Sequence, residues 1–228
     1  MERCHPALIQ RLFTRPSTLE KPMAKTPTDK IIKVPNDYWD KLIKRNIDEL
    51  CKLSLAHVYP PEGLLLHFLN MDIILDMENR SIHRLNFNKR EKIENPFLEF
   101  IILVYLLNVS SDNPGQDIIS VHDLKNAHFF QGPHELQTAL LVDLYGNNLE
   151  GFKSAAENLG GKTVDMADSA YMMLPFLKIP LYYLLWGGDD EFEPNLSILF
   201  DRSIEKHLAA DAIWGLVNLV SNYLLSGG

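Results

Sequence analysis

The sequence predicts a single domain of the α+β class, in which a largely antiparallel sheet packs against several helices. Two observations carry this prediction. Short apolar runs bounded by turn residues fall into two groups, at 64–85 and 170–200, as neighbouring antiparallel strands do. Segments with helical periodicity lie before, between and after these groups. The length of 228 residues and the hydrophobic content of 46% are sufficient for a sizeable core.

Residues 1–35 are predicted to form a flexible tail, and residues 36–228 the single α+β domain. Five prolines recur through the tail and discourage long helices and strands, namely Pro6, Pro16, Pro22, Pro27 and Pro35. Met23 stands just ahead of the folded part, so Met1 and Met23 are both candidates for the natural start.

The first helix is expected to begin at Asn36, which can cap its amino end. Its apolar stripe is predicted from four residues at helical spacing: Trp39, Ile43, Ile47 and Leu50. Pro60-Pro61 ends this region. Strands are expected at 64–68 and 73–77, and a less regular one at 81–85.

A helix is then predicted over 97–109, capped by Asn95 with Pro96 at its first position. The segment is apolar nearly all round, which is typical of a buried helix. A short strand is expected at 118–121. Two amphipathic helices follow, one at 149–159 that Gly160-Gly161 ends, and one at 134–145 with Leu136, Leu140 and Leu144 on one side.

The second group of strands is expected in the carboxyl-terminal part of the chain. Segments 170–174 and 181–186 read as strands, joined by a loop that contains Pro175 and Pro180. A further short strand is expected at 197–200, and a final helix at 210–225.

Charge and cysteine usage restrict the class of protein. The formal net charge of −8 argues against nucleic-acid binding, which needs a basic surface, and favours solubility. Cys4 and Cys51 form neither a metal-binding spacing nor an iron–sulfur motif, and they fit a reducing compartment. The longest apolar run, 100–107, is far shorter than the roughly 20 residues that span a bilayer. We therefore expect a cytoplasmic protein without a membrane span.

Two motifs are weaker than they look. Residues 159–163, Leu-Gly-Gly-Lys-Thr, resemble part of a phosphate-binding loop, but Ala156 stands where that loop requires glycine and the segment ends a helix. A helix cap is the better interpretation. His122, His128 and His134 recur every six residues, whereas metal ligands that share a helix face are three or four apart. We interpret them as ordinary polar histidines.

The informative segment follows the strand at 181–186. It places Asp189, Asp190, Glu191 and Glu193 within five residues, with Trp186 just before them and Asp201 just after the next predicted strand. Carboxylates in loops bind hard cations, so a divalent metal held by Asp190, Glu193 and Asp201 is one hypothesis. Recognition of a ligand or protein partner by all six residues is another, and a solvated acidic turn is the simplest. Phe192 is expected to turn inward and anchor the loop.

Residues 181–201, LYYLLWGGDDEFEPNLSILFD, resemble the signature of an uncharacterised prokaryotic family, domain of unknown function 3786. Further similarity lies in the small-residue helix that ends in Leu-Gly-Gly and in the proline-containing segment 174–180. The resemblance covers most of the chain from residue 36 and implies no known activity. It also implies a link to iron–sulfur or corrinoid metabolism, because some relatives carry a cysteine-rich iron–sulfur domain. This chain has only Cys4 in its tail, so a partner would have to supply such a cluster.

Three functional hypotheses stay open. The first is a binding or accessory module that uses the acidic region from Asp189 to Asp201 for a partner, such as an iron–sulfur or corrinoid-linked protein. The second is a metal-dependent enzyme that uses the same carboxylates. The third is a purely structural domain. The sequence identifies no catalytic residue, no cofactor and no oligomeric state.

Overall fold

The computed structural model describes residues 34–61, 63–87 and 89–227. The predicted tail therefore lies outside the described residues, apart from Val34 and Pro35. Within the described residues the fold is α+β, and every strand pairing is antiparallel. No helix in this part of the chain has both the length and the apolar character that crossing a membrane requires.

The strands form two five-stranded sheets among the described residues. The first sheet follows chain order and consists of β1 (His57–Tyr59), β2 (Gly63–Phe68), β3 (Met71–Asp76), β4 (Ser81–Asn86) and β5 (Lys89–Lys92). The three strands predicted at 64–85 are confirmed as β2, β3 and β4. The short strands β1 and β5 were not predicted, because β1 has only three residues and β5 is charged throughout.

The second sheet has the order β6-β10-β9-β8-β7. Its strands are β6 (Ile118–Ile119), β7 (Lys162–Thr163), β8 (Ser169–Phe176), β9 (Ile179–Trp186) and β10 (Asn195–Asp201). The expected loop between β8 and β9 shrinks to two residues, and both prolines lie in strands instead. Pro175 is tolerated because the pairing of β8 with β9 shifts register between Met173 and Phe176, so no ladder hydrogen bond is required there.

The predicted first helix is two helices, α2 (Asn36–Ile43) and α3 (Ile47–Ser54). The break occurs because the Asn46 side chain accepts a hydrogen bond from the backbone N–H of Glu49 and so starts a new helix. The change of direction splits the predicted stripe. Trp39 and Leu50 are buried, while Ile43 and Ile47 are exposed.

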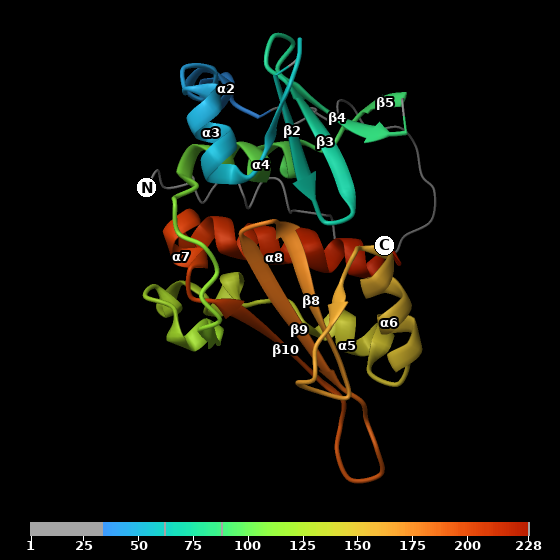
Figure 1. Ribbon diagram of the computed structural model, residues 1–228. Helices are drawn as coiled ribbons and strands as arrows, with labels where there is room; N and C mark the ends of the chain where they lie inside the picture. The colour runs from blue at the N-terminus through green and yellow to red at the C-terminus, as the bar shows by residue number, and fades with distance from the viewer. Residues whose placement is uncertain (1–33, 62, 88, 228) are drawn as a thin grey trace, which may run out of the picture.

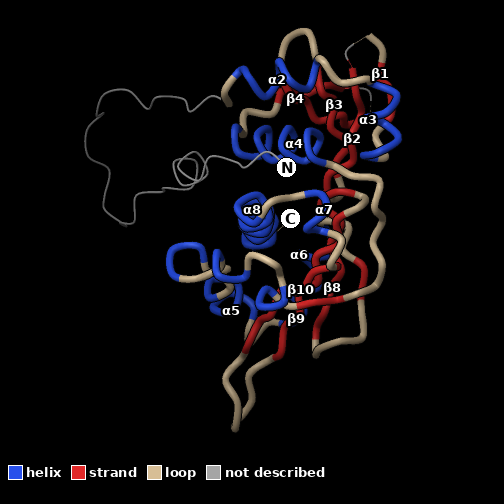
Figure 2. The backbone as a smooth tube through the Cα atoms, turned by 90° about the vertical axis from the view of Figure 1, so that its left-hand side faces the viewer, coloured by secondary structure: helices blue, strands red, loops and turns tan. Residues whose placement is uncertain are grey.

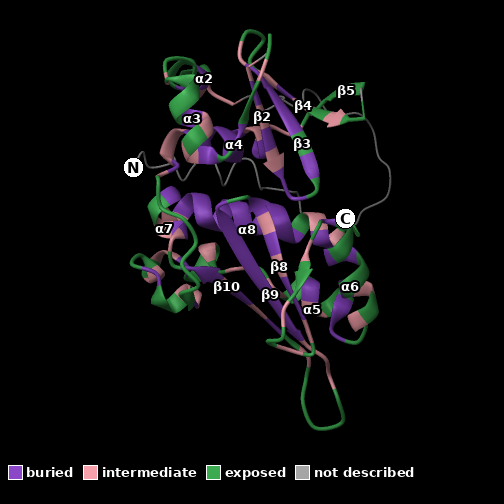
Figure 3. Cartoon of the chain, viewed as in Figure 1, coloured by how far each residue is buried: buried purple, intermediate pink, exposed green. Residues whose placement is uncertain are grey.

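Two long helices form the centre of the molecule. The α4 helix (Pro96–Asn108) is capped by Asn95 as predicted and is buried on nearly every side. The α8 helix (Ala210–Leu225) packs against it and is almost wholly buried (Figure 3). Tyr183 on β9 donates a hydrogen bond to the carbonyl of Val217 on α8, which ties the second sheet to this helix.

The remaining helices surround the second sheet. They are α5 (Ala139–Tyr145), α6 (Leu149–Asn158), α7 (Ile204–His207) and three short 3-10 helices, η1 (Val121–Asp123), η2 (Ala127–Phe129) and η3 (Gly132–His134). The helix expected to begin at His134 begins at Ala139 instead. Its buried residues are Leu141 and Tyr145, so the predicted stripe was wrong there, and Leu140 and Leu144 are exposed.

The elements are arranged in two layers, with most helices on one side and the strands of both sheets on the other (Figure 2). Figure 1 shows the first sheet with α2, α3 and α4 in the upper half and the second sheet in the lower half, with α8 between them. The first and second sheets meet where the N–H of Leu69 donates to the carbonyl of Pro175. One hydrophobic core contains residues of both sheets and of α2 to α8, so the described residues form a single domain.

Candidate functional site

The predicted acidic segment connects β9 and β10. We call residues 187–194 the acidic arm. The arm projects beyond the end of the second sheet and forms the lowest part of the molecule in Figure 1. Gly187-Gly188 leaves β9 and Pro194 enters β10, so the sequence places its turn residues at the two ends of the arm.

Asp189 folds the arm. Its Oδ1 accepts hydrogen bonds from the backbone N–H groups of Glu191 and Phe192 at 2.8 and 2.7 Å, and its own N–H donates to the carbonyl of Phe192 at 2.9 Å. The two accepted bonds lower the pKa of Asp189 below its ordinary value. Asp189 is therefore the residue that shapes the turn.

The base of the arm is fixed to two neighbouring segments. The N–H of Gly187 donates to the Asp168 carboxylate at 3.0 Å, and the N–H of Gly188 donates to the carbonyl of Gly146 at 3.2 Å. Pro194 packs so closely on Gly146 that a Cβ there would lie 2.6 Å from the Pro194 Cβ. These contacts hold the arm in one direction relative to the sheet.

The tip of the arm faces solvent. Asp190, Glu191 and Glu193 are exposed, and none of their carboxylates forms a hydrogen bond or ion pair with another described residue. Phe192 is 70% exposed. The expectation that Phe192 turns inward was therefore wrong, because Asp189 and the contacts at the base already anchor the loop.

Trp186 lies at the foot of the arm, at the end of β9. It is half-buried and packs in a small apolar cluster around Ala170, Tyr182 and Leu184 on the outer face of the second sheet. Trp186 is thus separated from the tip and belongs to the sheet surface beneath the arm.

Asp201 lies at the opposite end of β10 from the arm, about 20 Å away along a strand that rises about 3.3 Å per residue. Its side chain is buried, with 1% of the residue exposed. It accepts backbone N–H bonds from Gly115 and Gln116 at Oδ2 and from Ser203 at Oδ1, at 2.8–3.0 Å. Burial alone would raise the pKa of Asp201, but the hydrogen bonds outweigh it and lower the pKa.

The three carboxylates of the metal hypothesis are therefore not brought together. Asp190 and Glu193 lie on the arm, while Asp201 holds the 115–116 loop at the far end of β10. The described residues contain no group of three or more His, Cys, Asp or Glu side chains placed to share a metal ion. This includes the three evenly spaced histidines, which lie on η1, η2 and η3, where His134 stacks on Phe129.

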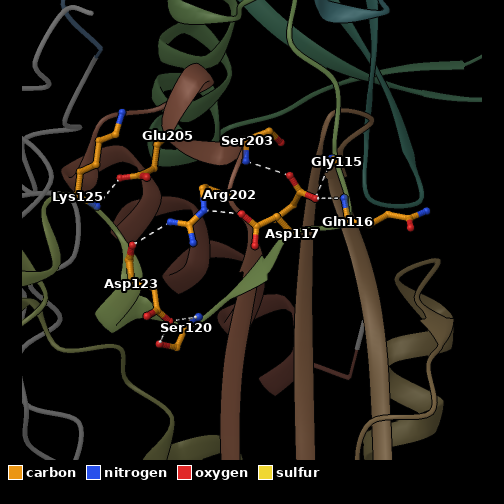
Figure 4. A network of polar contacts seen from close by, with 10 residues as sticks. Gly115, Gln116, Asp117, Ser120, Asp123, Lys125, Arg202, Ser203 and Glu205 are labelled. Carbon is orange, nitrogen blue, oxygen red and sulfur yellow. Dashed lines mark hydrogen bonds and ion pairs between the residues drawn. The ribbon is translucent and has the colours of Figure 1, made fainter.

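Asp201 belongs to a polar network that the sequence did not predict. Figure 4 shows side chains from the β10–α7 junction bonded to the segment 115–125. Arg202 pairs with the Asp117 carboxylate and donates to the carbonyl of Asp123, and Glu205 accepts from the N–H of Lys125. The partners are about 80 residues apart in the chain, and no local pattern in the sequence links them.

A second unpredicted cluster is buried beside this network. His207 is fully buried, and its Nδ1 accepts the N–H of Ser110 at 3.2 Å. The ammonium of Lys178, also buried, donates to the carbonyl of Ser110 at 2.9 Å. Burial and the charge of Lys178 lower the pKa of His207 to about 4, against the attraction of Asp112 and Asp201. The cluster joins α7, the β8–β9 turn and the end of α4.

The Leu-Gly-Gly-Lys-Thr segment is a helix end followed by a strand. Gly160 adopts φ +79° after α6, and the N–H of Gly161 returns to the carbonyl of Ala156 at 2.8 Å. Lys162 and Thr163 then form β7. The helix-cap interpretation is confirmed, since the chain turns away from the helix at this point.

Comparison with known families identifies a match over most of the chain. A family model described as a domain of unknown function (DUF3786) matches residues 46–223, which include both sheets, the acidic arm and most of α8. No curated protein and no solved structure matches the chain.

Proposed function

The chain belongs to the family of domains of unknown function DUF3786, and from that premise we propose that it is a binding module that recognises a protein partner through the acidic arm. The observation that carries the proposal is Phe192, which is 70% exposed at the tip of the arm between Glu191 and Glu193.

The fold does not need the side chains at the tip. Asp189 alone supplies the hydrogen bonds that close the turn. An exposed phenylalanine forgoes about 2 kcal/mol of burial, and neighbouring carboxylates repel one another. An apolar pocket rimmed by Lys or Arg on a partner would relieve both costs, since it buries the ring and pairs the carboxylates.

The backbone conformation of the arm is also preorganised for binding. Its turn is closed by Asp189 and its base is held by Asp168 and Gly146, so little backbone order has to be gained on association. A preorganised projection fits a concave surface, which makes the partner the side that supplies the pocket.

The charge of this end of the molecule favours a basic protein as the partner. Residues 179–201 contain no Lys or Arg, so this end of the molecule repels the phosphates of nucleic acids and of anionic lipids. It attracts a basic protein surface. For a metal-dependent enzyme the arm offers only the Asp190, Glu191 and Glu193 carboxylates at its tip, with Asp201 a strand length away. An iron–sulfur or corrinoid-linked partner stays a prediction that depends on the resemblance alone.

The test compares three baits in affinity capture from the source cell with chemical crosslinking. The first bait is the wild-type chain, the second carries Phe192→Ser, and the third carries Asp190→Asn with Glu193→Gln. We expect one protein to be crosslinked at the arm of the wild type and lost from both variants. Reconstitution with that purified protein should show at least about tenfold weaker binding for each variant, about 1.4 kcal/mol.

A matched control variant carries Asp37→Asn with Glu49→Gln, two exposed acids on α2 and α3 far from the arm. It should bind the partner as the wild type does. Equal binding by all four proteins would show that the arm is only a solvated loop. The metal hypothesis would be favoured instead if no protein partner is captured and the wild type binds Mg²⁺, Ca²⁺, Mn²⁺ or Zn²⁺. The Asp190→Asn with Glu193→Gln variant should then lose that metal binding.

A further inference from the structure

The molecule carries a second projecting hairpin of opposite charge, formed by β4 and β5. Residues 80–92 contain a single acid, Glu91, and five cations, Arg80, Arg84, Lys89, Arg90 and Lys92. Arg80 is paired with Asp40, and the guanidinium of Arg90 lies over the Tyr59 ring, 5.4 Å from its centroid. Phe87, in the turn, is 96% exposed. We call residues 84–87 and 89–92 the basic hairpin.

The outer strand of the basic hairpin is open to an incoming surface. In the order β1-β2-β3-β4-β5, β5 is an edge strand, and each of its four residues is exposed and charged. Charged edges resist pairing with another strand, so a partner would bind here through side chains and not by adding a strand.

The basic hairpin and the acidic arm complement each other but lie at opposite ends of the molecule. Figure 1 shows β5 at the upper right and the acidic arm at the bottom. The arm presents four carboxylates and no cation, and the hairpin presents four cations and one carboxylate. Each has an exposed phenylalanine at its tip, in Phe192 and Phe87. Their separation prevents contact within one chain.

We propose that the acidic arm binds the basic hairpin of a second copy of this chain. The proposal rests on the proposed function of the arm and names its partner. A second copy is favoured because every chain presents both complementary surfaces. Nucleic acid and anionic membranes are the competing occupants of the basic hairpin, but the net charge of −8 repels both once they approach the rest of the molecule.

The contact has two possible symmetries. Because the two surfaces lie at opposite ends, two copies side by side in opposite directions would form both contacts at once and close as a dimer. Copies related head to tail would instead extend as a chain. Both arrangements use the same arm-to-hairpin contact, so one set of variants tests them together.

Sedimentation velocity of the full chain measures the association directly. We expect the average mass to rise with protein concentration at about 0.1 M salt and to fall toward the monomer at about 1 M, where the screening length drops from about 10 to about 3 Å. A wild-type chain that stays monomeric at about 0.1 M salt and at every concentration tested overturns the proposal.

Charge reversal identifies the contact. One variant carries Asp190→Lys, Glu191→Lys and Glu193→Lys, which makes the arm positive although Asp189 is kept. The other carries Lys89→Glu with Arg90→Glu, which makes the hairpin negative. Each alone should be monomeric, because its arm and hairpin have the same sign. An equimolar mixture should associate again, because each arm then meets a hairpin of opposite sign. Circular dichroism confirms that both variants are folded, and a folded pair that does not associate in the mixture contradicts the proposal.

A control variant reverses the charge of two exposed lysines outside the hairpin, Lys44→Glu with Lys52→Glu. This variant should associate like the wild type. Phosphatidylserine vesicles and a single-stranded oligonucleotide are tested as ligands of the wild type. The wild type could stay monomeric and bind the vesicles or the oligonucleotide, and Lys89→Glu with Arg90→Glu could abolish that binding. This result would assign the hairpin to that ligand and overturn the proposal. If the chain stays monomeric while the arm variants still lose a different protein partner, the proposed function survives and only this inference fails.

Discussion

At the scale of single residues, Asp201 shows how one carboxylate can organise a junction. It accepts three backbone N–H bonds at the end of β10, from residues on the 115–116 loop and on the segment leading to α7. Hydrogen bonds to a charged acceptor are stronger than neutral ones, and a buried N–H without a partner is costly. The residue predicted as a metal ligand is therefore a structural one.

Asp201→Ala should lower the free energy of unfolding by about 3 kcal/mol, because three partly buried backbone N–H groups lose their hydrogen bonds to a charged acceptor. Urea unfolding followed by circular dichroism measures the loss. Asp190→Ala serves as the control and should leave stability within about 0.5 kcal/mol, as is usual for an exposed site. Equal effects of the two changes would mean that the hydrogen bonds to Asp201 contribute little.

His207 gives the stability a predictable dependence on pH. Its pKa is about 4 in the folded chain and about 6.5 when unfolded, so between these values the unfolded state binds the proton and the folded state does not. Stability is complete above about pH 6.5 and falls as the pH falls toward 4. The shift corresponds to about 3 kcal/mol.

The measurement is urea unfolding at several pH values, with His207→Gln as the comparison. The variant should lose the part of the pH dependence that lies between about pH 6.5 and pH 4. Carboxylates whose pKa is lowered in the folded state, such as Asp201, cause a separate loss of stability below about pH 4. This loss lies outside the pH range assigned to His207. An unchanged pH profile in the folded variant would show that His207 is not the titrating group.

At the scale of elements, helix ends and turns are set by short-range chemistry. Asn95 and Asn46 start helices by accepting backbone N–H bonds, and Gly160 ends α6 with a positive φ. The acidic arm follows the same rule, since Asp189 closes its turn. The other acids of the arm have no such role, which is why their removal should affect binding and not folding.

Gly160→Ala should destabilise the protein by about 1 kcal/mol, because alanine adopts a positive φ poorly, while a new Cβ would make only ordinary van der Waals contact with Asn70, at 3.6 Å. Thermal unfolding measures the change. Gly115→Ala is a suitable control, since its φ is not positive and nothing lies within 4 Å of its added Cβ. A phosphate-binding role predicts instead that calorimetry detects ATP binding and that Lys162→Ala abolishes it.

Asp190→Asn with Glu193→Gln should leave the melting temperature unchanged or raise it slightly, because the change relieves repulsion between exposed carboxylates and removes no hydrogen bond. Differential scanning calorimetry at low salt provides the comparison with the wild type. A variant that melts several degrees lower would show that these acids support the fold, and the arm could then no longer be treated as a separate recognition element.

At the scale of the whole molecule, the two sheets share one core. Phe68 of the first sheet packs edge to face on Phe176 of the second, and Tyr105 of α4 stacks on the same ring at 3.9 Å. The central position of α4 and α8 means that neither half can keep its apolar surface covered without the other.

The chain should therefore unfold in a single cooperative transition. Trp39 reports on the first half and Trp214 on the second, so two variants that each keep only one of them, with Trp186 also replaced, allow separate fluorescence measurements. Their urea midpoints should coincide with each other and with the midpoint from circular dichroism. Two separated midpoints would mean that the halves are independent domains.

Features that depend on neighbouring residues in the chain could be predicted from the sequence alone. The α+β class, the buried helix capped by Asn95, the glycine stop at residues 160–161 and the acidic segment all follow from spacing over a few residues. The tertiary structure decided what depends on distant partners. It placed Asp201 in a network with residues more than 80 positions away, buried His207 against Lys178 and left Phe192 in solvent. Periodicity shows that a residue is apolar or charged, but only packing decides what it faces.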